Sequence, residues 1–271
     1  MIPKIIHYCW FGRGEMPELV MQCIASWHRH MPEWEYRLWN EETTTEALKK
    51  LSPSPFLNEG ENAPLLNPLK KGDEDWLEYM PVYVREAYAA KKYAFVSDYV
   101  RLWALEQYGG LYMDVDFEVY KPFDDLMEKY DAYAGYEGSK RNPVMMGVIA
   151  AKAHHLWIRK MMQTYNQRLF IQADGSYDMT PNTGYFLNWM QAHGFAADGR
   201  EKDFMGVRVL PVEYFCPILT TGENLRCEHT YCVHKGLHSW SGSGGWKAKV
   251  LSVFGAQWKT KMIKLKRKIF D

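Results

Sequence analysis

The sequence has few cysteines, no net charge and no long apolar run. Its five cysteines in 271 residues are odd in number and sparse, which argues against a secreted disulfide scaffold and favours a reducing cytoplasm. Zero formal net charge argues against a dedicated nucleic-acid-binding protein. No run approaches the roughly 18 apolar residues of a transmembrane helix, and residues 1–7 lack the features of a signal peptide. We therefore expect a cytoplasmic globular protein.

Charge is nevertheless distributed unevenly along the chain. Residues 247–271 contain eight Lys or Arg and one acid, a net charge of +7, so the remainder carries −7. Apolar residues recur in this tail at spacings of three and four, which predicts an amphipathic helix with lysines on its other face. Such a helix is typical of elements that bind an anionic membrane surface, although packing on the protein body would also explain it.

The hydrophobic pattern predicts alternating strands and helices. Strands are expected at residues 5–11, 35–39, 111–120, 132–136, 144–150, 207–210 and 230–234, and helices at 17–31, 82–108, 155–165 and 184–193. A break in the long helix is expected near Ser97, and Gly109-Gly110 ends it. His7 is expected to be a core histidine with its hydrogen bonds made. The prolines and glycines of residues 52–81 indicate an irregular insertion, and the β-α-β rhythm favours an α/β sheet.

A pair of carboxylates carries the strongest chemical signal. In one continuous strand, Tyr112, Asp114 and Asp116 would share a face, because alternate side chains point the same way. Two neighbouring carboxylates repel each other unless a cation joins them. Mg²⁺ and Mn²⁺ prefer carboxylate oxygens completed by substrate phosphates. The motif therefore predicts a clamp for a metal ion and a diphosphate.

A second pair precedes this motif on the predicted helix. Asp98 and Arg101 are three residues apart and so lie on one helical face. They form either a local ion pair of small energy or a site for sugar hydroxyls and phosphate oxygens.

Several sequence blocks resemble the Asp-x-Asp sugar-binding glycosyltransferases of family 32. The blocks are Ile2–Gly12, Ser26-Trp27, Trp39-Asn40, Ala94–Leu102 and Gly109–Asp116. They also resemble, more distantly, the catalytic domain of the large clostridial glucosylating toxins. The resemblance implies a GT-A-like α/β fold: one domain over residues 1–246, with a mixed, mainly parallel sheet flanked by helices, and the tail of residues 247–271 as a C-terminal helix.

The resemblance also implies roles for individual residues. Asp98, Arg101, Asp114 and Asp116 would form the catalytic set, and Asp114, Asp116 and His238 would hold Mn²⁺ or Mg²⁺. The residues that would contact the donor are Trp10, Tyr112, Asn182 and Trp240. Glu137 and Asn182 are candidates to face the transferred sugar. Where many relatives have proline after Asn-Thr-Gly, this chain has Tyr185.

The implied activity is transfer of a hexose, with retention of configuration, from a nucleotide-sugar to a glycan or lipid-linked glycan in polysaccharide or capsule synthesis. A UDP-sugar is favoured over GDP-mannose. The tail would place the enzyme at the inner face of the cell membrane. The alternative is a non-catalytic nucleotide-sugar or glycan-binding protein on the same fold. A zinc site built from Cys227, Cys232 and nearby histidines is disfavoured, because the cysteine spacing is unusual for zinc.

Overall fold

The computed structural model describes residues 1–50, 76–138, 142–219 and 221–236. Contacts divide the chain into two units after Lys235, and the helices and strands of the structure belong to the first unit, Met1–Lys235. The predicted insertion therefore lies outside the described residues except for residues 76–81, where Trp76–Tyr79 form a short 3-10 helix, η2. His238, Trp240 and the tail of residues 247–271 also lie outside them. Within the described residues, no helix is long and apolar enough to span a membrane.

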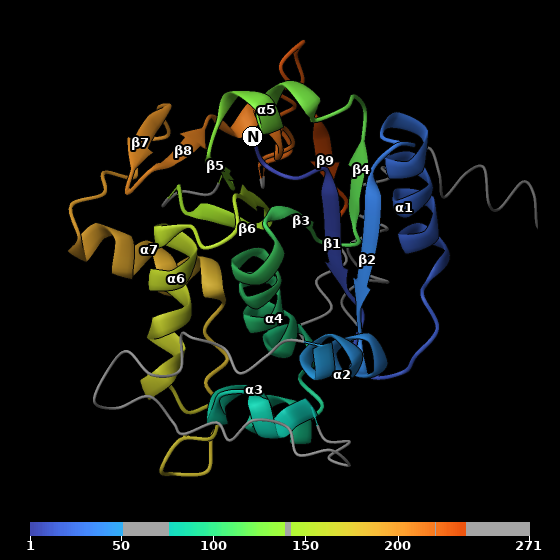
Figure 1. Ribbon diagram of the computed structural model, residues 1–271. Coiled ribbons are helices and arrows are strands. Elements are labelled where there is room, and N and C mark those ends of the chain that lie inside the picture. The colour runs from blue at the N-terminus through green and yellow to red at the C-terminus, as the bar shows by residue number, and fades with distance from the viewer. Residues whose placement is uncertain (51–75, 139–141, 220, 237–271) are drawn as a thin grey trace, which may run out of the picture. The chain divides into compact units, whose positions relative to one another are not determined.

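A seven-stranded mixed sheet forms the centre of this unit (Figure 1). Its order is β2-β1-β3-β6-β5-β8-β7, and all strands except β6 and β7 run in one direction. The strands are β1 (Ile5–Cys9), β2 (Glu35–Trp39), β3 (Gly110–Met113), β5 (Ala132–Tyr136), β6 (Val144–Ala151), β7 (Lys202–Phe204) and β8 (Val207–Leu210). A separate pair joins β4 (Phe117–Val119) to β9 (Cys232–His234). This confirms the expected mixed, mainly parallel sheet.

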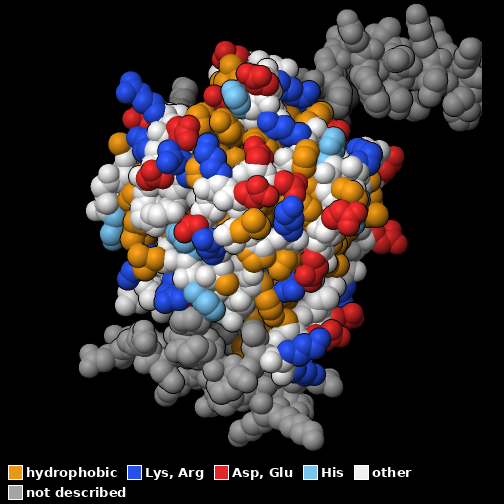
Figure 2. All heavy atoms as spheres, turned by 45° about the horizontal axis from the view of Figure 1, so that its top comes forward, with side chains coloured by type: hydrophobic (Ala, Val, Ile, Leu, Met, Phe, Trp, Pro, Cys, Tyr) orange, Lys and Arg blue, Asp and Glu red, His pale blue; other side chains and the backbone are white. Residues whose placement is uncertain are grey.

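Helices cover both faces of the sheet. On one side lie α3 (Val82–Ala89), α4 (Tyr93–Tyr108), α6 (Leu156–Gln163) and α7 (Asn182–Ala192), and on the other α1 (Glu18–His30) and α5 (Asp124–Lys129). The helix α2 (Glu41–Lys50) and the 3-10 helices η3 (Thr164–Gln167) and η4 (Val212–Tyr214) complete the unit. On the face drawn in Figure 2, acidic and basic side chains are interspersed over the described surface.

Alternation along the central strands sorts their side chains into two cores. In β3, Tyr112 packs with α3, α4, α6 and α7, whereas Leu111 and Met113 pack on the side of α1 and α5. Every residue of β3, β5 and β6 is buried, as expected of strands covered on both faces. α4 is buried from Val100 to Glu106, which explains why its sequence is apolar nearly all round.

Two local predictions were wrong in position. The break in the predicted helix 82–108 falls at residues 90–92, between α3 and α4, and not near Ser97. Lys91 adopts a left-handed φ of 56° there, without a glycine or proline to signal it. The strand expected at 111–120 is also interrupted, because Asp114, Val115 and Asp116 form a turn between β3 and β4. Gly109 does end α4, as expected, with a φ of 62°.

His7 is a satisfied core histidine, as predicted. Its Nε2 donates to the Gly109 carbonyl oxygen at 2.8 Å, and its Nδ1 accepts from the indole of Trp39 at 3.1 Å. Burial lowers the pKa of His7 to about 4, so the ring is neutral. This neutral ring joins β1 and β2 to the end of α4, next to the start of β3.

Candidate active site

The carboxyl ends of parallel strands gather the chemistry at one edge of the sheet. β1 and β3 are parallel neighbours, so Trp10, which follows β1, and Asp114, which follows β3, lie at the same edge. Glu137 follows β5, which runs in the same direction. In open α/β sheets this edge is where ligands bind. The half-buried Trp10 donates its indole N–H to the Gly14 carbonyl oxygen at 2.6 Å.

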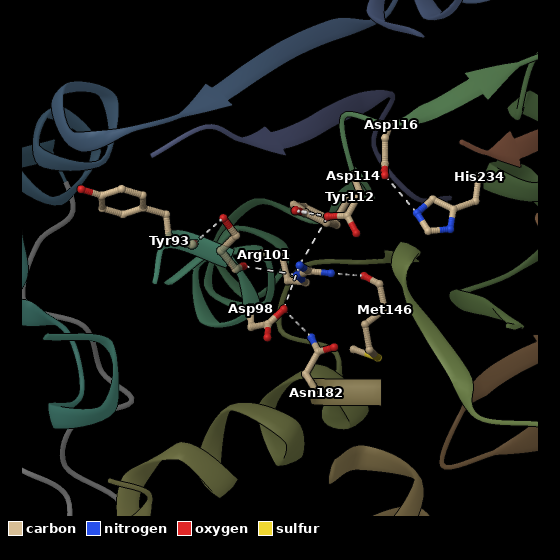
Figure 3. A network of polar contacts seen from close by, with 10 residues as sticks. Tyr93, Asp98, Arg101, Tyr112, Asp114, Asp116, Met146, Asn182 and His234 are labelled. Atoms are coloured by element: carbon tan, nitrogen blue, oxygen red, sulfur yellow. Dashed lines mark hydrogen bonds and ion pairs between the residues drawn. The ribbon is translucent and has the colours of Figure 1, made fainter. Parts of the chain in front are cut away.

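Arg101 is the centre of a buried polar network (Figure 3). Its Nη2 lies 2.9 Å from Asp98 Oδ1 and 3.4 Å from Asp114 Oδ1, and its Nη1 donates to the Met146 carbonyl oxygen at 2.6 Å. The guanidinium also lies over the Tyr112 ring, 4.6 Å from its centroid. Only 6% of the Arg101 side chain is exposed. The Asp98–Arg101 pair is therefore part of a larger buried network and is not an exposed helical ion pair.

Each carboxylate that Arg101 contacts has a further partner. The Tyr112 hydroxyl donates to Asp114 Oδ1 at 2.7 Å, and the Asn182 amide donates to Asp98 Oδ1 at 2.8 Å. The structure thus brings together five residues that the sequence analysis singled out: Asp98, Arg101, Tyr112, Asp114 and Asn182. They come from α4, the end of β3 and the first turn of α7, so residues 84 positions apart meet in one network.

The turn after β3 corrects the expected geometry of the carboxylate pair. Asp114 and Asp116 do not share one face of a continuous strand, because the turn separates their partners. Asp114 contacts Arg101 and Tyr112, whereas Asp116 Oδ2 lies 3.1 Å from His234 Nε2 on β9. The turn is held by the Asp114 amide, which donates to the Gly147 carbonyl oxygen at 2.7 Å.

Helix α1 anchors the strand that follows the turn. The Trp27 indole donates to the Phe117 carbonyl oxygen at 2.7 Å, and the Val119 amide donates to the Ser26 hydroxyl at 2.9 Å. Both side chains are fully buried. The Ser26-Trp27 block thus fixes β4 directly after Asp116.

His234 is a site residue that the sequence analysis considered only as part of the disfavoured zinc site. Its ring stacks on Phe117, with centroids 4.7 Å apart, and pairs with Asp116. Burial lowers its pKa, but the charge and hydrogen bond of Asp116 outweigh burial and raise it to about 9, so the ring is protonated. Its partner Asp116 lies 118 positions earlier in the sequence. The predicted strand at residues 230–234 was the sequence feature that indicated a structured position for His234.

Glu137 lies close to this pair. Burial raises the pKa of the Glu137 carboxyl, while the charge of His234 and a hydrogen bond with Thr183 lower it by a smaller amount. Glu137 therefore lies near both β9 and the first turn of α7, on the side of the site where Asn182 contacts Asp98.

The donor set suits a hard divalent cation. Asp114 keeps a third of its side chain exposed, and its Oδ2 occupies space beside Gly147, where an added Cβ would lie 2.7 Å away. Mg²⁺ and Mn²⁺ commonly take one or two carboxylates and complete their shell with water and substrate phosphate. Within the described ranges, no three acidic, histidine or cysteine side chains form a cluster able to hold a metal. Asp114 and Asp116 fit a metal shared with a diphosphate better than a closed protein cage.

The pKa of Asp98 predicts a pH-dependent difference in stability between the wild type and a variant that lacks this carboxyl. Burial raises its pKa from 3.8 to about 6, although the nearby Arg101 lowers it. A carboxyl with a raised pKa favours the folded state below its unfolded value, and this contribution is lost as pH rises through the folded value. Asp98→Asn keeps the Oδ1 acceptor but cannot titrate. We expect the unfolding free energy of the wild type to fall relative to this variant between pH 3.8 and about 6.

Urea unfolding of both proteins across this range, without metal, measures the effect. A difference between them that stays constant with pH would contradict the assignment.

Comparison with known proteins identifies this region. Residues 17–133 match the family described as the glycosyltransferase sugar-binding region containing a DXD motif. The chain is 30% identical over 131 residues to inositol phosphoceramide mannosyltransferase 1 of Schizosaccharomyces pombe. That match covers 47% of this chain and 32% of the yeast protein, so the chain spans about a third of this relative.

Two solved glycosyltransferase structures resemble the chain at low sequence identity. The PaToxG glycosyltransferase shares 16% identity over 71% of both chains, with a TM-score of 0.44. The galactosyltransferase LgtC, in complex with donor and acceptor sugar analogs, shares 12% identity over 95% of this chain and 99% of its own, also with a TM-score of 0.44. Residues 17–133, which contain both Asp98–Arg101 and Asp114–Asp116, are thus similar to the DXD-containing sugar-binding region of glycosyltransferases.

Proposed function

We propose that this protein transfers a hexose from a nucleotide-sugar to a glycan or lipid-linked glycan acceptor, with retention of configuration. The observation that carries the proposal is the buried network of Asp98, Arg101 and Asp114 at the ligand-binding edge of the sheet, beside Asp116. We favour a UDP-sugar over GDP-mannose as donor, on the resemblance of the motif blocks.

The residues of the network have separate tasks in this proposal. Asp114 and Asp116 would hold Mn²⁺ or Mg²⁺, for which His238, outside the described residues, is a further candidate ligand, and His234 orients the Asp116 carboxylate. Such a metal would supply positive charge for the diphosphate leaving group. Trp10, Tyr112 and Trp240 contact the nucleotide and diphosphate. Asp98 and Asn182 bind hydroxyls of the donor sugar, and Glu137 faces the sugar from β5.

Arg101 supplies fixed positive charge where the reaction generates negative charge. The bond between the anomeric carbon and the diphosphate oxygen breaks, and its electron pair leaves with the diphosphate. The acceptor oxygen forms the new bond on the same face of that carbon, and its proton passes to the departing diphosphate oxygen. A guanidinium held by two carboxylates and a carbonyl oxygen is already oriented, so it needs little reorganisation as charge develops.

Release of free nucleotide from a donor panel tests the proposal. The full chain is incubated with UDP-glucose, UDP-galactose, UDP-N-acetylglucosamine and GDP-mannose, with Mn²⁺ and separately with EDTA. We expect slow release of nucleoside diphosphate from one donor, dependent on the metal. Binding of a nucleotide-sugar without release, even with glycan acceptors present, would instead identify a non-catalytic binding protein. Absence of both binding and release would overturn the proposal.

The basic tail predicts attachment to an anionic membrane. Its eight Lys and Arg residues, at about 1 kcal/mol each near an anionic leaflet, would hold the enzyme where a lipid-linked acceptor lies. We expect the full chain to pellet with vesicles containing anionic phosphatidylserine, and a variant lacking residues 247–271 to remain in the supernatant. Vesicles of phosphatidylcholine alone are the control. Equal pelleting of both proteins would show that the tail does not bind the membrane.

A further inference from the structure

A second charged cluster lies beside Asp98, around Arg168. Only 7% of the Arg168 side chain is exposed. Its Nη2 contacts Asp178 Oδ2 at 2.8 Å and the Tyr83 hydroxyl at 3.3 Å. The guanidinium carbon lies 4.0 Å from the ring centroid of Tyr185, 4.4 Å from that of Tyr83 and 5.1 Å from that of Tyr165. Arg168 is thus held on an aromatic surface by one acid.

Three polar atoms of this cluster are buried without a hydrogen-bond partner. They are Nε and Nη1 of Arg168 and the hydroxyl of Tyr165, none of which pairs with another protein group in the described part of the chain. Leaving a buried donor unpaired costs about 1–3 kcal/mol. Native proteins rarely leave such groups unpaired unless a ligand, ion or water completes them. Three such atoms in one cluster therefore point to a missing oxygen-bearing partner.

The cluster adjoins the sugar side of the candidate site. The charge of Arg168 acts on the carboxyl of Asp98, and the charge of Asp98 acts on the phenol of Tyr165. Tyr185 is three residues after Asn182 on α7, so it lies one helical turn from the amide that contacts Asp98. The side chains of Asp98 and Asp178 keep 13% and 21% of their surface exposed. The unpartnered atoms are therefore within electrostatic reach of Asp98, and Asp98 and Asp178 both keep some contact with solvent.

The charges of the cluster favour a neutral ligand group. Asp178 balances Arg168, and Arg101 balances Asp98, so no uncompensated cation is present to bind an acid. A hydroxyl can donate to a carboxylate and accept from a phenol or guanidinium at the same time. Asp98 uses only Oδ1 for Arg101 and Asn182 in the contacts described here. A sugar hydroxyl matches this combination of donors and acceptor.

We propose that Tyr165 and Arg168 bind a hydroxyl of the donor sugar together with Asp98, and so help to determine which sugar is accepted. This inference rests on the proposed function, because it requires a nucleotide-sugar donor. Tyr185 covers the guanidinium face, and a small displacement of its ring would admit the hydroxyl to the cluster.

Tyr165→Phe tests the inference because it removes one oxygen that makes no hydrogen bond among the described residues. Loss of a hydrogen bond to the ligand would raise the dissociation constant of the preferred nucleotide-sugar about 3- to 10-fold. The dissociation constant of the free nucleoside diphosphate should not change, because it lacks the sugar. The unfolding midpoint in urea should stay the same or rise, since a buried unpaired polar atom is removed. If Tyr165 had only a structural role, its substitution would not weaken nucleotide-sugar binding while leaving the binding of free nucleotide unchanged.

Two further variants serve as comparisons. Thr44→Val removes another buried hydroxyl, on α2, that has no hydrogen-bond partner within the described ranges, and it should leave the affinity for nucleotide-sugar unchanged. Arg168→Lys keeps a charge for Asp178 but cannot reproduce the guanidinium geometry, so it should weaken nucleotide-sugar binding at least as much as Tyr165→Phe.

Donors lacking single sugar hydroxyls identify the group that is bound. One deoxy donor should bind the wild type more weakly than the parent donor, yet bind Tyr165→Phe as well as the parent does. Calorimetry on the full chain, with Mn²⁺ present, measures all of these constants. Wild-type affinity for the nucleotide-sugar in Tyr165→Phe would overturn this inference alone, and so would an equal loss of affinity for the free nucleotide. Failure of the wild type to bind any nucleotide-sugar would overturn the proposed function and this inference with it.

Discussion

Replacing Asp116 with asparagine is expected to reduce metal-dependent release of nucleoside diphosphate by on the order of 10²–10³-fold, the range found when a single group that stabilises developing charge is removed. Asparagine retains the size of the side chain and an oxygen that can accept from His234, which lies 3.1 Å from the carboxylate. It lacks the negative charge that a divalent cation requires. The Mn²⁺ concentration needed for half-maximal release should therefore rise as well.

Steady-state release at increasing Mn²⁺ concentration separates these two effects. Glu118→Gln is the matched control, because it makes the same change of charge two residues further on, where the carboxylate pairs with Lys235 at 2.5 Å. The control should retain release near that of the wild type. Wild-type release by Asp116→Asn at every Mn²⁺ concentration would exclude Asp116 as a metal ligand.

Arg101→Met is expected to abolish donor turnover and to lower the free energy of unfolding by about 3–5 kcal/mol, the cost of removing one partner from a buried ion pair. The substitution leaves Asp98 and Asp114 without their shared cation and leaves the Met146 carbonyl oxygen without its donor. Without the guanidinium, the pKa of Asp98 rises further above its unfolded value. The variant should therefore recover part of the lost stability as pH falls and this carboxyl takes up a proton.

Urea unfolding at neutral pH and near pH 5 measures both the loss and the recovery. The matched control is Arg37→Met, since Arg37 forms a more exposed ion pair with Glu35 on β2 and should cost about 1 kcal/mol or less. Arg101→Lys distinguishes charge from shape, because lysine cannot span Asp98, Asp114 and the Met146 carbonyl oxygen together. If Arg101→Met unfolded with the same urea midpoint as the wild type, the network would not stabilise the fold.

Local spacing was sufficient to single out the pairs Asp98–Arg101 and Asp114–Asp116, whereas Trp10 and Asn182 came from the family resemblance. The interval between Asp98 and Arg101 places both on one helical face whatever the rest of the chain does, and the structure confirms that they pair. Gly109 likewise ends α4 for a local reason, since a residue with positive φ is needed at that point. These features depend on residues within one or two helical turns, so a single sequence can reveal them.

The errors arose where distant contacts override local pattern. Tyr112 to Asp116 alternates as a strand does, but the hydrogen bond from the Asp114 amide to Gly147 on β6 accompanies a turn there. The predicted helix is interrupted at Lys91 without a glycine or proline, between two helices that pack against each other. His234 and Asp116 meet because β9 pairs with β4, a pairing between segments more than a hundred residues apart.

The sequence alone determined the α/β class, the end of α4 and the identity of the charged residues, because these follow from periodicity, backbone conformation and side-chain chemistry. Only the tertiary structure decided how those residues are used. It joined Asn182 to Asp98, paired Asp116 with His234, and placed Arg168 and Tyr165 within electrostatic reach of Asp98. The physical reason is that burial makes an unpaired charge or hydroxyl costly, so the partners that long-range packing supplies determine what each buried polar group can do.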